Sequence, residues 1–344
     1  MAKKENKERF DQRPPTMADV AERVGVSRQL VGLVFRDAPG VSADTEAKIR
    51  AAAKELGYRP NLAAQSLRRE GSKYIGLVFH ASESSTYDII PAIYKQAAEQ
   101  GFQLVLSAIS SDRTDLEAID EVIGHRCDGL ILIASTLSLT RLQKLARTIP
   151  LVSLGRRLTG VRCGVVSSRG ESGVFDAVEY LIGLGHKSIA YVNAKDMLDI
   201  EYRLEGYESA MDKHHLKKTI IGISGDFAEA GGALAAEQLL AMEKLPTAVV
   251  CNNDQSAFGL IHCLQKAGLK VPEDVSVVGY DDTIAKEPYL DMTTVRQDPA
   301  ELAKASVEDL AARIRGDKYL SETFLTSSTL VVRSSTCQPK NLTD

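Results

Sequence analysis

TMADVAERVGVSRQLVGLVF, residues 16–35, decides the fold of the first part of the chain. Thr16 is a good N-cap residue, and Asp19 places a carboxylate near the first-turn amides of a short helix. Gly25 provides the backbone freedom that ends this helix, and Ser27 caps a second helix with apolar residues on one face. Two short helices joined by a tight turn are typical of a helix-turn-helix, whose second helix lies in the major groove of DNA.

This pair of helices alone fits either a DNA reader or any small helical domain. The next stretch, VSADTEAKIRAAAKELGY at residues 41–58, predicts a third helix that begins after Ser42 and ends at Gly57. Residues 61–69, NLAAQSLRR, then form a short helical segment with few apolar anchors and two arginines at its end.

At this point the chain resembles the lac repressor family of transcription regulators. The matching stretches, MADVAERVGVS, VSADTEAKIRAAAKELGYRPN and AAQSLRR, occur in the family's order and spacing. The resemblance implies base reading by Arg28, Gln29 and Leu33. Arginine suits the acceptor pair of guanine, glutamine the mixed edge of adenine, and leucine the thymine methyl group. Thr16 and Ser27, with their adjacent amides, would hold phosphates and set the register.

The recognition helix departs from the family at three positions. The family usually has Thr, Ser and Arg where this chain has Leu30, Gly32 and Leu33. We therefore expect an operator that differs from the family's usual one. The alternative for Leu30 and Leu33 is that both are additional core residues.

Residues 59–72 resemble the family's hinge helix and linker, which follow the helix-turn-helix domain at residues 16–58. The resemblance implies DNA contacts by Asn61, Ala64 and Leu67, and it implies that Leu67 wedges between two base pairs in the minor groove. Such a wedge unstacks the bases at a cost of a few kcal/mol and is offset by the contacts that the kink allows.

Composition indicates a soluble globular protein with a charge division that suits DNA binding. The chain has 344 residues, of which 44 % are hydrophobic and 26 % charged. No apolar run approaches the roughly 18 residues of a membrane span, so no membrane contact is expected. Residues 1–71 hold 14 Lys/Arg against 10 Asp/Glu, whereas the remainder holds 28 against 36. The positive charge therefore lies where phosphate binding needs it.

The N-terminus and the cysteines favour a cytoplasmic protein. Residues 1–15, MAKKENKERFDQRPP, are expected to form a flexible charged tail and lack the apolar core of a signal peptide. The five cysteines include no CxxC pair, and an odd count without a signal peptide favours reduced thiols. The histidines show no metal-ligand spacing with them, so we expect neither a metal nor a cofactor.

Strand and helix patterns alternate through residues 73–344. The pattern predicts strands at 74–79, 102–108, 129–133, 150–154, 188–192, 248–252 and 275–280. It predicts helices at 89–100, 116–125, 172–184, 204–214 and 255–267. Repeated strand-helix units with apolar strands predict parallel sheets covered by helices on both faces. Because the units form two series, the sequence predicts an α/β region of two similar lobes with a cleft between them.

This region again resembles the lac repressor family, whose effector domain is similar to periplasmic sugar-binding proteins. The matches are YLIGLGHKSIAYV, RLEGY, VPEDVSVVGYDDT and LTSSTLVVRSST. The resemblance implies that the chain crosses between the lobes three times, near Val166, Thr294 and Thr323. Ligands bind where the carboxyl ends of the strands face the cleft.

Polar residues at those strand ends are the candidate effector ligands. Arg203 matches the family arginine that reaches the effector, while Asn253 and Asp281 directly follow predicted strands. Guanidinium and carboxylate groups pair well with vicinal hydroxyls, so this set suits a sugar or polyol. Asp254 is interpreted instead as a helix cap, and Asp282 as a turn residue.

The loop after the first predicted strand departs from the family and indicates a different ligand. Where many members have Asn-Pro-Phe-Phe, this chain has SSTY at residues 84–87. Ser84 and Tyr87 are candidate effector contacts. The family's usual Asp-Asn pair after Val166 is missing, and Arg169-Gly170 lies near that position. The sequence therefore predicts a class of ligand but no particular compound.

Catalysis is not expected, because the chain has neither GxGxxG nor GxSxG and the adjacent Asp281 and Asp282 have poor geometry for shared acid-base work. The sequence predicts a ligand-controlled regulator that binds near-palindromic double-stranded DNA as a homodimer. The C-terminal CQPKNLTD lacks the leucine heptads that make tetramers. Two alternatives stay open: a solute-binding protein without a regulatory role, and a regulator controlled by a protein partner.

Overall fold

The computed structural model describes residues 13–36, 38–59, 71–194, 201–223, 228–317 and 323–340. The chain divides into two compact units, which we call the head (Met1–Ser72) and the body (Lys73–Asp344). The predicted hinge contacts Asn61, Ala64 and Leu67 lie outside the described residues. No helix in the described ranges is long and apolar enough to cross a membrane.

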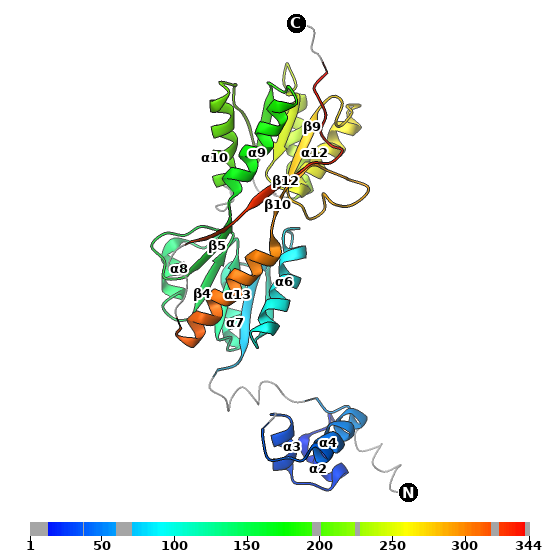
Figure 1. The fold of residues 1–344 in the computed structure, drawn as a ribbon, viewed down its shortest axis with the longest axis vertical. Coiled ribbons are helices and arrows are strands. Elements are labelled where there is room, and N and C mark those ends of the chain that lie inside the picture. The colour runs from blue at the N-terminus through cyan, green and yellow to red at the C-terminus, as the bar shows by residue number, and fades with distance from the viewer. Residues whose placement is uncertain are drawn as a thin grey trace. The chain divides into compact units, whose positions relative to one another are not determined.

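The described residues of the head form three helices around a small apolar core (blue in Figure 1). Their bounds are Met17–Val24 for α2, Arg28–Val34 for α3 and Ala43–Leu56 for α4. The core is made by fully buried side chains from all three helices, among them Val20, Val31 and Ile49. The head is therefore a packed domain in which α3 is fixed by its buried face.

Helix ends in the head follow the predicted signals. The Thr16 amide donates to Asp19 Oδ2 at 2.7 Å, and Leu30 N donates to Ser27 Oγ at 3.1 Å. Gly25 ends α2 with φ of 74°, a left-handed conformation in which glycine has no steric cost. Arg13, which the sequence placed in the tail, binds both oxygens of Asp19 at 2.8 Å. This ion pair fixes the chain just before α2.

Lobe 1 of the body is built on a parallel sheet of order β11-β5-β4-β3-β1-β2. Its strands are β1 (Tyr74–His80), β2 (Gln103–Ile109), β3 (Gly129–Ile133), β4 (Leu151–Leu154), β5 (Gly164–Ser168) and β11 (Phe324–Thr326). Its helices are α6 (Thr86–Glu99), α7 (Asp115–Gly124), α8 (Leu139–Leu145) and α13 (Pro299–Arg315). One apolar core joins α6 and α13 to one face, and a second core joins α7 and α8 to the other.

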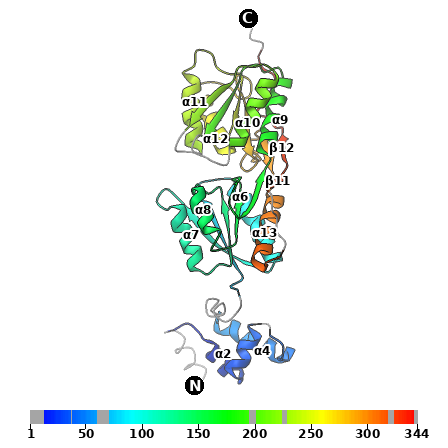
Figure 2. The same ribbon diagram turned by 90° about the vertical axis from the view of Figure 1, so that its left-hand side faces the viewer.

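Lobe 2 repeats this plan with a sheet of order β12-β10-β9-β8-β6-β7, in which β12 is antiparallel to β10. Its strands are β6 (Ile189–Ala194), β7 (Thr219–Ile223), β8 (Ala248–Cys251), β9 (Ser276–Asp281), β10 (Thr294–Gln297) and β12 (Ser328–Val331). Its helices are α9 (Gly170–Gly183), α10 (Glu201–Lys213), α11 (Glu229–Leu240) and α12 (Asp254–Lys266). Helices α11 and α12 cover one face, and α9 and α10 cover the other (Figure 2).

The predicted two-lobed α/β fold is confirmed, and the predicted strands and helices agree with it within about three residues at each end. In the described ranges the chain crosses between the lobes after β5, after β10 and after β11. Each crossing lies a few residues beyond its predicted position, at Arg169, Asp298 and Ser327, because each strand continues to the lobe boundary. Figure 1 shows β10 and β12 side by side at this boundary.

Candidate functional site

The exposed face of α3 is the candidate DNA-reading surface. Arg28 and Gln29 are exposed in its first turn, next to the exposed cap residue Ser27. Leu30 packs against the head core, so the alternative interpretation as a core residue holds for this position. Leu33 is half-buried and is not part of that core cluster. The structure thus brings together Ser27, Arg28, Gln29 and Leu33 on one helix.

Polar contacts fix the end of α3 and, separately, the start of α2. Arg50 donates to the carbonyl of Val34 at 3.3 Å, which fixes the last turn of α3 against α4. Thr16 is exposed, and its hydroxyl donates to Asp19 Oδ2 at 2.7 Å. The Arg13 guanidinium holds the pKa of the buried Asp19 carboxyl well below its usual range. The start of α2 is therefore stabilised by a permanently charged carboxylate.

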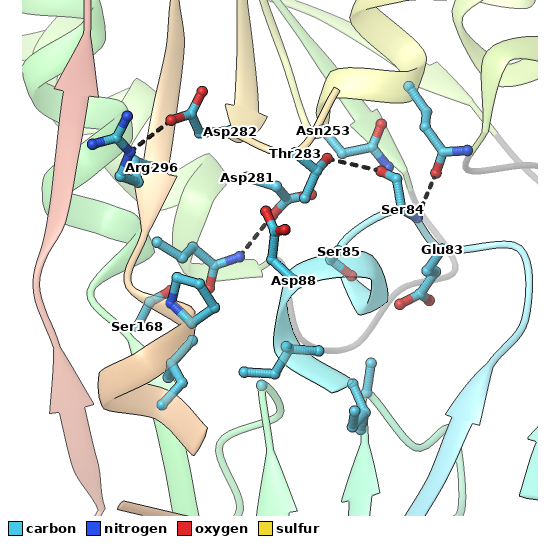
Figure 3. A pocket seen from close by; sticks show the side chains of 18 of the residues that line it. Glu83, Ser84, Ser85, Asp88, Ser168, Asn253, Asp281, Asp282, Thr283 and Arg296 are labelled. Atoms are coloured by element: carbon cyan, nitrogen blue, oxygen red, sulfur yellow. Dashed lines mark hydrogen bonds and ion pairs between the residues drawn. The ribbon is translucent and has the colours of Figure 1, made fainter. Parts of the chain in front are cut away.

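A cavity of about 300 Å³ lies between the two lobes of the body. It is lined at the carboxyl ends of strands from both sheets, where the topology of such folds places ligands. Figure 3 shows side chains of the loop between β1 and α6 facing those that follow β8 and β9. Four of the five predicted effector residues line it: Ser84, Arg203, Asn253 and Asp281.

Arg203 is held by three different contacts at the inner side of this cavity. Its Nη1 donates to the carbonyl of Asn252 at 2.5 Å, and its guanidinium lies 3.7 Å from the ring centroid of Tyr280. Its Nη2 is 3.9 Å from Asp281 Oδ1. A Cβ atom added to Gly170 would lie 3.0 Å from Arg203 Cγ. Gly170, at the position where the family pair is missing, therefore leaves room for this arginine.

The two aspartates after β9 have different partners. Gln297 donates to Asp281 Oδ1 at 2.6 Å, whereas Asp282 binds Arg296 at 2.6 Å and Arg333 at 2.7 Å. Both aspartates have positive φ, 109° and 59°. Non-glycine residues in this region cost on the order of 1 kcal/mol and are held by their surroundings. Asp282 is thus a turn residue, as predicted, and also the centre of an ion-pair network.

The interpretation of Asp254 as the helix cap is wrong. Asn253 is the cap of α12, and its Oδ1 accepts from Ser256 N at 2.7 Å. Asp254 is fully buried instead and accepts from Thr283 N at 2.8 Å and Thr294 Oγ1 at 2.6 Å. Burial, followed by the negative charge of Asp281, raises the pKa of Asp254 to about 7. The strand ends one residue earlier than predicted, and this exchanges the two roles.

Direct contacts join the two lobes across the cavity; we call them the interlobe bridge. Gln255 Oε1 accepts from the Ser84 amide at 2.9 Å, and Thr283 Oγ1 donates to Ser84 Oγ at 3.2 Å. Lys286 Nζ lies 2.6 Å from Asp88 Oδ2. The segment from Ser84 to Asp88 therefore binds lobe 2 directly, in addition to its predicted role as a ligand contact.

Comparison with known proteins identifies the family. Residues 16–61 match the bacterial regulatory proteins of the lacI family, and residues 178–336 match a periplasmic binding protein-like domain. A probable HTH-type transcriptional repressor ExuR from Bacillus subtilis is 31 % identical over 331 residues, which are 93 % of this chain and 98 % of that protein. This chain belongs to the LacI family.

Other LacI-family proteins are similar over nearly the full length. The HTH-type transcriptional repressor PurR of Haemophilus influenzae is 32 % identical over 306 residues, 87 % of this chain and 91 % of that protein. The lac repressor dimer bound to operator and the anti-inducer ONPF has a TM-score of 0.79 and 30 % identity, covering 94 % of this chain and 100 % of that one. A CelR-cellobiose complex has a TM-score of 0.69 and 29 % identity, covering 93 % and 99 %. The chain is therefore a DNA-binding transcription regulator and not an enzyme.

Tyr87 is the predicted effector residue that this LacI-family cavity does not use. Its side chain is 60 % exposed and it does not line the cavity. Ser85, Asp88 and Ile89 do line it, at the i, i+3 and i+4 spacing of one helix face. Tyr87 lies about 100° of helix rotation away from Asp88, so it faces outward.

Several lining residues were not predicted from the sequence. Polar ones lie in both lobes and at the crossings: Glu83, Ser85, Asp88, Ser168, Asn252, Gln255, Thr283, Lys286, Arg296 and Gln297. Apolar ones come from lobe 1: Ile89, Ile133, Ala134, Leu154, Pro299 and Leu302. The position of Asn252 and Gln255 beside Asn253 was a usable signal, whereas Lys286 and Gln297 become neighbours only through the fold.

The charges in the cavity are largely balanced. Asp282 is paired with Arg296, Asp88 with Lys286, and Asp281 lies beside Arg203 and Gln297. A ligand that enters meets hydrogen-bonding groups on one side and aliphatic groups on the other, without a strong excess of either charge. In the described residues, no group of three or more His, Cys, Asp or Glu could hold a metal ion, and all five cysteines are free.

Proposed function

We propose that this LacI-family chain binds a near-palindromic operator as a homodimer in the cytoplasm. Helix α3 enters the major groove, where Arg28, Gln29 and Leu33 read bases, while Thr16 and Ser27 contact phosphates. The exposure of Arg28 and Gln29 in the first turn of α3, and of the cap residues Thr16 and Ser27, supports this assignment. The lac repressor, which is 30 % identical, has been solved as a dimer on its operator. Asn61, Ala64 and Leu67 would add minor-groove contacts.

We further propose that a neutral sugar or polyol binds in the interlobe cavity and controls DNA affinity. The observation that carries this proposal is that Arg203 in the first turn of α10, Asn253 after β8 and Asp281 at the end of β9 line one interlobe cavity. Neutral hydroxyls can both donate to Asp281 and accept from Arg203. Structures of relatives with cellobiose and with ribose support this ligand class.

Coupling between ligand and DNA follows from the two-lobed construction. A ligand that favours one arrangement of the lobes shifts the equilibrium between the two arrangements, and the operator shifts the same equilibrium. Each must then change the affinity of the other by the same factor. The interlobe bridge is the element whose contacts differ between an open and a closed arrangement.

The test combines a thermal-shift screen with an operator-binding measurement. The purified chain is screened against sugars, polyols, sugar phosphates and nucleosides, and a ligand at 100 times its dissociation constant should add about 2.7 kcal/mol to the free energy of unfolding. We expect a neutral sugar or polyol to shift the melt and to change operator affinity in the same titration. A ligand that shifts the melt without changing operator affinity would indicate a solute-binding protein. Control by a protein partner would be indicated if no compound shifts it.

A further inference from the structure

Asn252 has a buried amide group without a hydrogen-bond partner. It directly follows β8, is 1 % exposed and lines the interlobe cavity. Neither its Nδ2 nor its Oδ1 has a partner in the part of the chain that the structure describes. Buried side-chain amides are almost always hydrogen-bonded, because burial removes their water and the lost bonds must be replaced. The missing partners therefore require an explanation.

The surrounding backbone fixes this residue in place. Its carbonyl accepts from Arg203 Nη1 at 2.5 Å, and the next residue, Asn253, caps α12 through Ser256 N at 2.7 Å. A Cβ atom added to Gly279 on β9 would lie 2.5 Å from Asp254 Oδ1, so the neighbouring part of the sheet is tightly packed. Asn252 thus lies between two positions that the fold holds rigidly, next to the arginine of the proposed effector site.

A second buried polar group gives a useful contrast. The Tyr191 hydroxyl on β6 is also buried without a partner among the described residues. Tyr191 pairs with Val250 in the sheet and its ring stacks on Tyr207 at 5.3 Å between centroids, but it does not line the cavity. Both residues therefore have a buried polar group without a partner among the described residues, but of the two only Asn252 lines the cavity.

We propose that Asn252 binds the effector directly, with Nδ2 donating to one ligand oxygen and Oδ1 accepting from a ligand hydroxyl. This inference rests on the proposed function, since it requires a hydroxyl-bearing ligand in the cavity. An amide carries donors on one side and an acceptor on the other, and two neighbouring hydroxyls satisfy both. Asn252 then selects ligands with a vicinal hydroxyl pair next to Arg203.

The test compares Asn252→Leu and Asn252→Ala with the wild type. Leucine has nearly the shape of asparagine and removes both polar atoms, and replacing an unpaired polar group by an apolar one of the same shape is neutral or stabilising. The melting temperature is measured without ligand. Titration calorimetry then uses D-ribose, cellobiose and myo-inositol as probes, and each probe that shifts the wild-type melt is titrated into every variant. Tyr191→Phe is the matched control.

We expect Asn252→Leu to melt at or above the wild-type temperature and to bind the probe about tenfold or more weakly. Tyr191→Phe should keep or raise the melting temperature with unchanged affinity. A lower melting temperature of Asn252→Leu with unchanged probe affinity would overturn the inference, because the amide would then serve the fold. Asn252→Ala decides the affinity comparison if leucine does not fit.

The two proposals fail in different ways. If none of the three probes binds the wild type, none of them is the effector, and the proposed sugar or polyol ligand fails for these three compounds. The melting temperatures alone then test the proposal for Asn252. An Asn252→Leu variant as stable as the wild type then supports an amide kept for a ligand, while a less stable one refutes it.

Discussion

The two lobes share one architecture but present opposite surfaces to the cavity between them. Lobe 2 contributes charged and amide groups, including Arg203 from α10 and Asp281 from the end of β9, whereas the floor from lobe 1 is mostly aliphatic. The polar residues of lobe 1 are concentrated in the segment 83–88, which also forms the interlobe bridge. Under the proposed function, we expect lobe 2 to recognise the effector and lobe 1 to exclude water and close the cavity.

The largest expected effect comes from Arg203→Ala in lobe 2. The change removes a guanidinium that is 11 % exposed and stacked on Tyr280, so we expect effector affinity to fall at least about 100-fold. Operator affinity without effector should stay within about twofold, because the head is a separate unit. Fluorescence anisotropy with labelled operator measures the operator affinity, and calorimetry measures the effector affinity. A variant that responds normally to effector would remove Arg203 from the site.

The second effect is a pH dependence of stability through Asp254, behind the polar surface of lobe 2. Its pKa is raised to about 7 in the folded chain from 3.8, so the folded state binds more protons between these values. The contribution of Asp254 to the free energy of unfolding should therefore fall by up to about 4 kcal/mol as pH rises from about 4 to about 7. Above about pH 7 this contribution should stay constant. Asp254→Asn keeps the shape and removes this titration.

Urea unfolding of both proteins across this pH window measures the difference. Other groups titrate equally in both, so the wild type minus the variant isolates Asp254. A difference that did not change with pH would show that the carboxylate stays charged throughout. That result would strengthen the contrast between a charged lobe 2 and an apolar lobe 1.

A smaller effect is expected from Gly170→Ala, at the start of α9. The added Cβ would lie 3.0 Å from Arg203 Cγ and 3.3 Å from the Tyr280 hydroxyl. Crowding of this kind costs about 1–3 kcal/mol, and we expect effector affinity to fall on the order of tenfold as Arg203 moves. Gly183→Ala is the matched control at the other end of α9, where nothing lies within 4 Å of the added atom. Equal affinities of the two variants would contradict this role for Gly170.

The smallest effect should come from the interlobe bridge. Lys286→Met removes the ion pair with Asp88, whose side chains are 45 % and 39 % exposed, so its contribution is about 0–1 kcal/mol and falls with salt. Lys213→Met removes a comparable pair with Glu179 inside lobe 2. We expect effector affinity to become less salt-dependent only in Lys286→Met. The same loss of salt dependence in both variants would show that the bridge has no special part in closure.

Local signals explain why the head could be predicted closely. Ser27 caps α3, Gly25 ends α2 with φ of 74°, and the third helix ends at Gly57 as expected. Each of these depends on residues within one helical turn of one another. The ion pair of Arg13 with the buried Asp19 also spans only six residues, but Arg13 stands in a charged stretch that was predicted to be a tail.

The cavity could be predicted only in part, because its residues meet through the fold. Asn253 and Asp281 were predicted from their places after strands and Arg203 from the family resemblance, whereas Lys286 reaches Asp88 across 198 positions. The predicted role of Asp254 as a helix cap was wrong because its partners Thr283 and Thr294 come 29 and 40 residues later in the sequence. Helix α13 was not assigned, although Asp298 as cap and Pro299 in the first turn are recognisable start signals.

The crossings also bear on synthesis of the chain. Lobe 1 begins with β1 at Tyr74 but receives α13 and β11 only after residues 299 and 324 have been made. A ribosome adding about 5–20 residues per second releases every strand and helix of lobe 2 except β12 before lobe 1 has its last strand. A chain that stops early would therefore leave the apolar face that α13 covers open to chaperones and proteases. The head, which ends at Ser72, can fold long before either lobe.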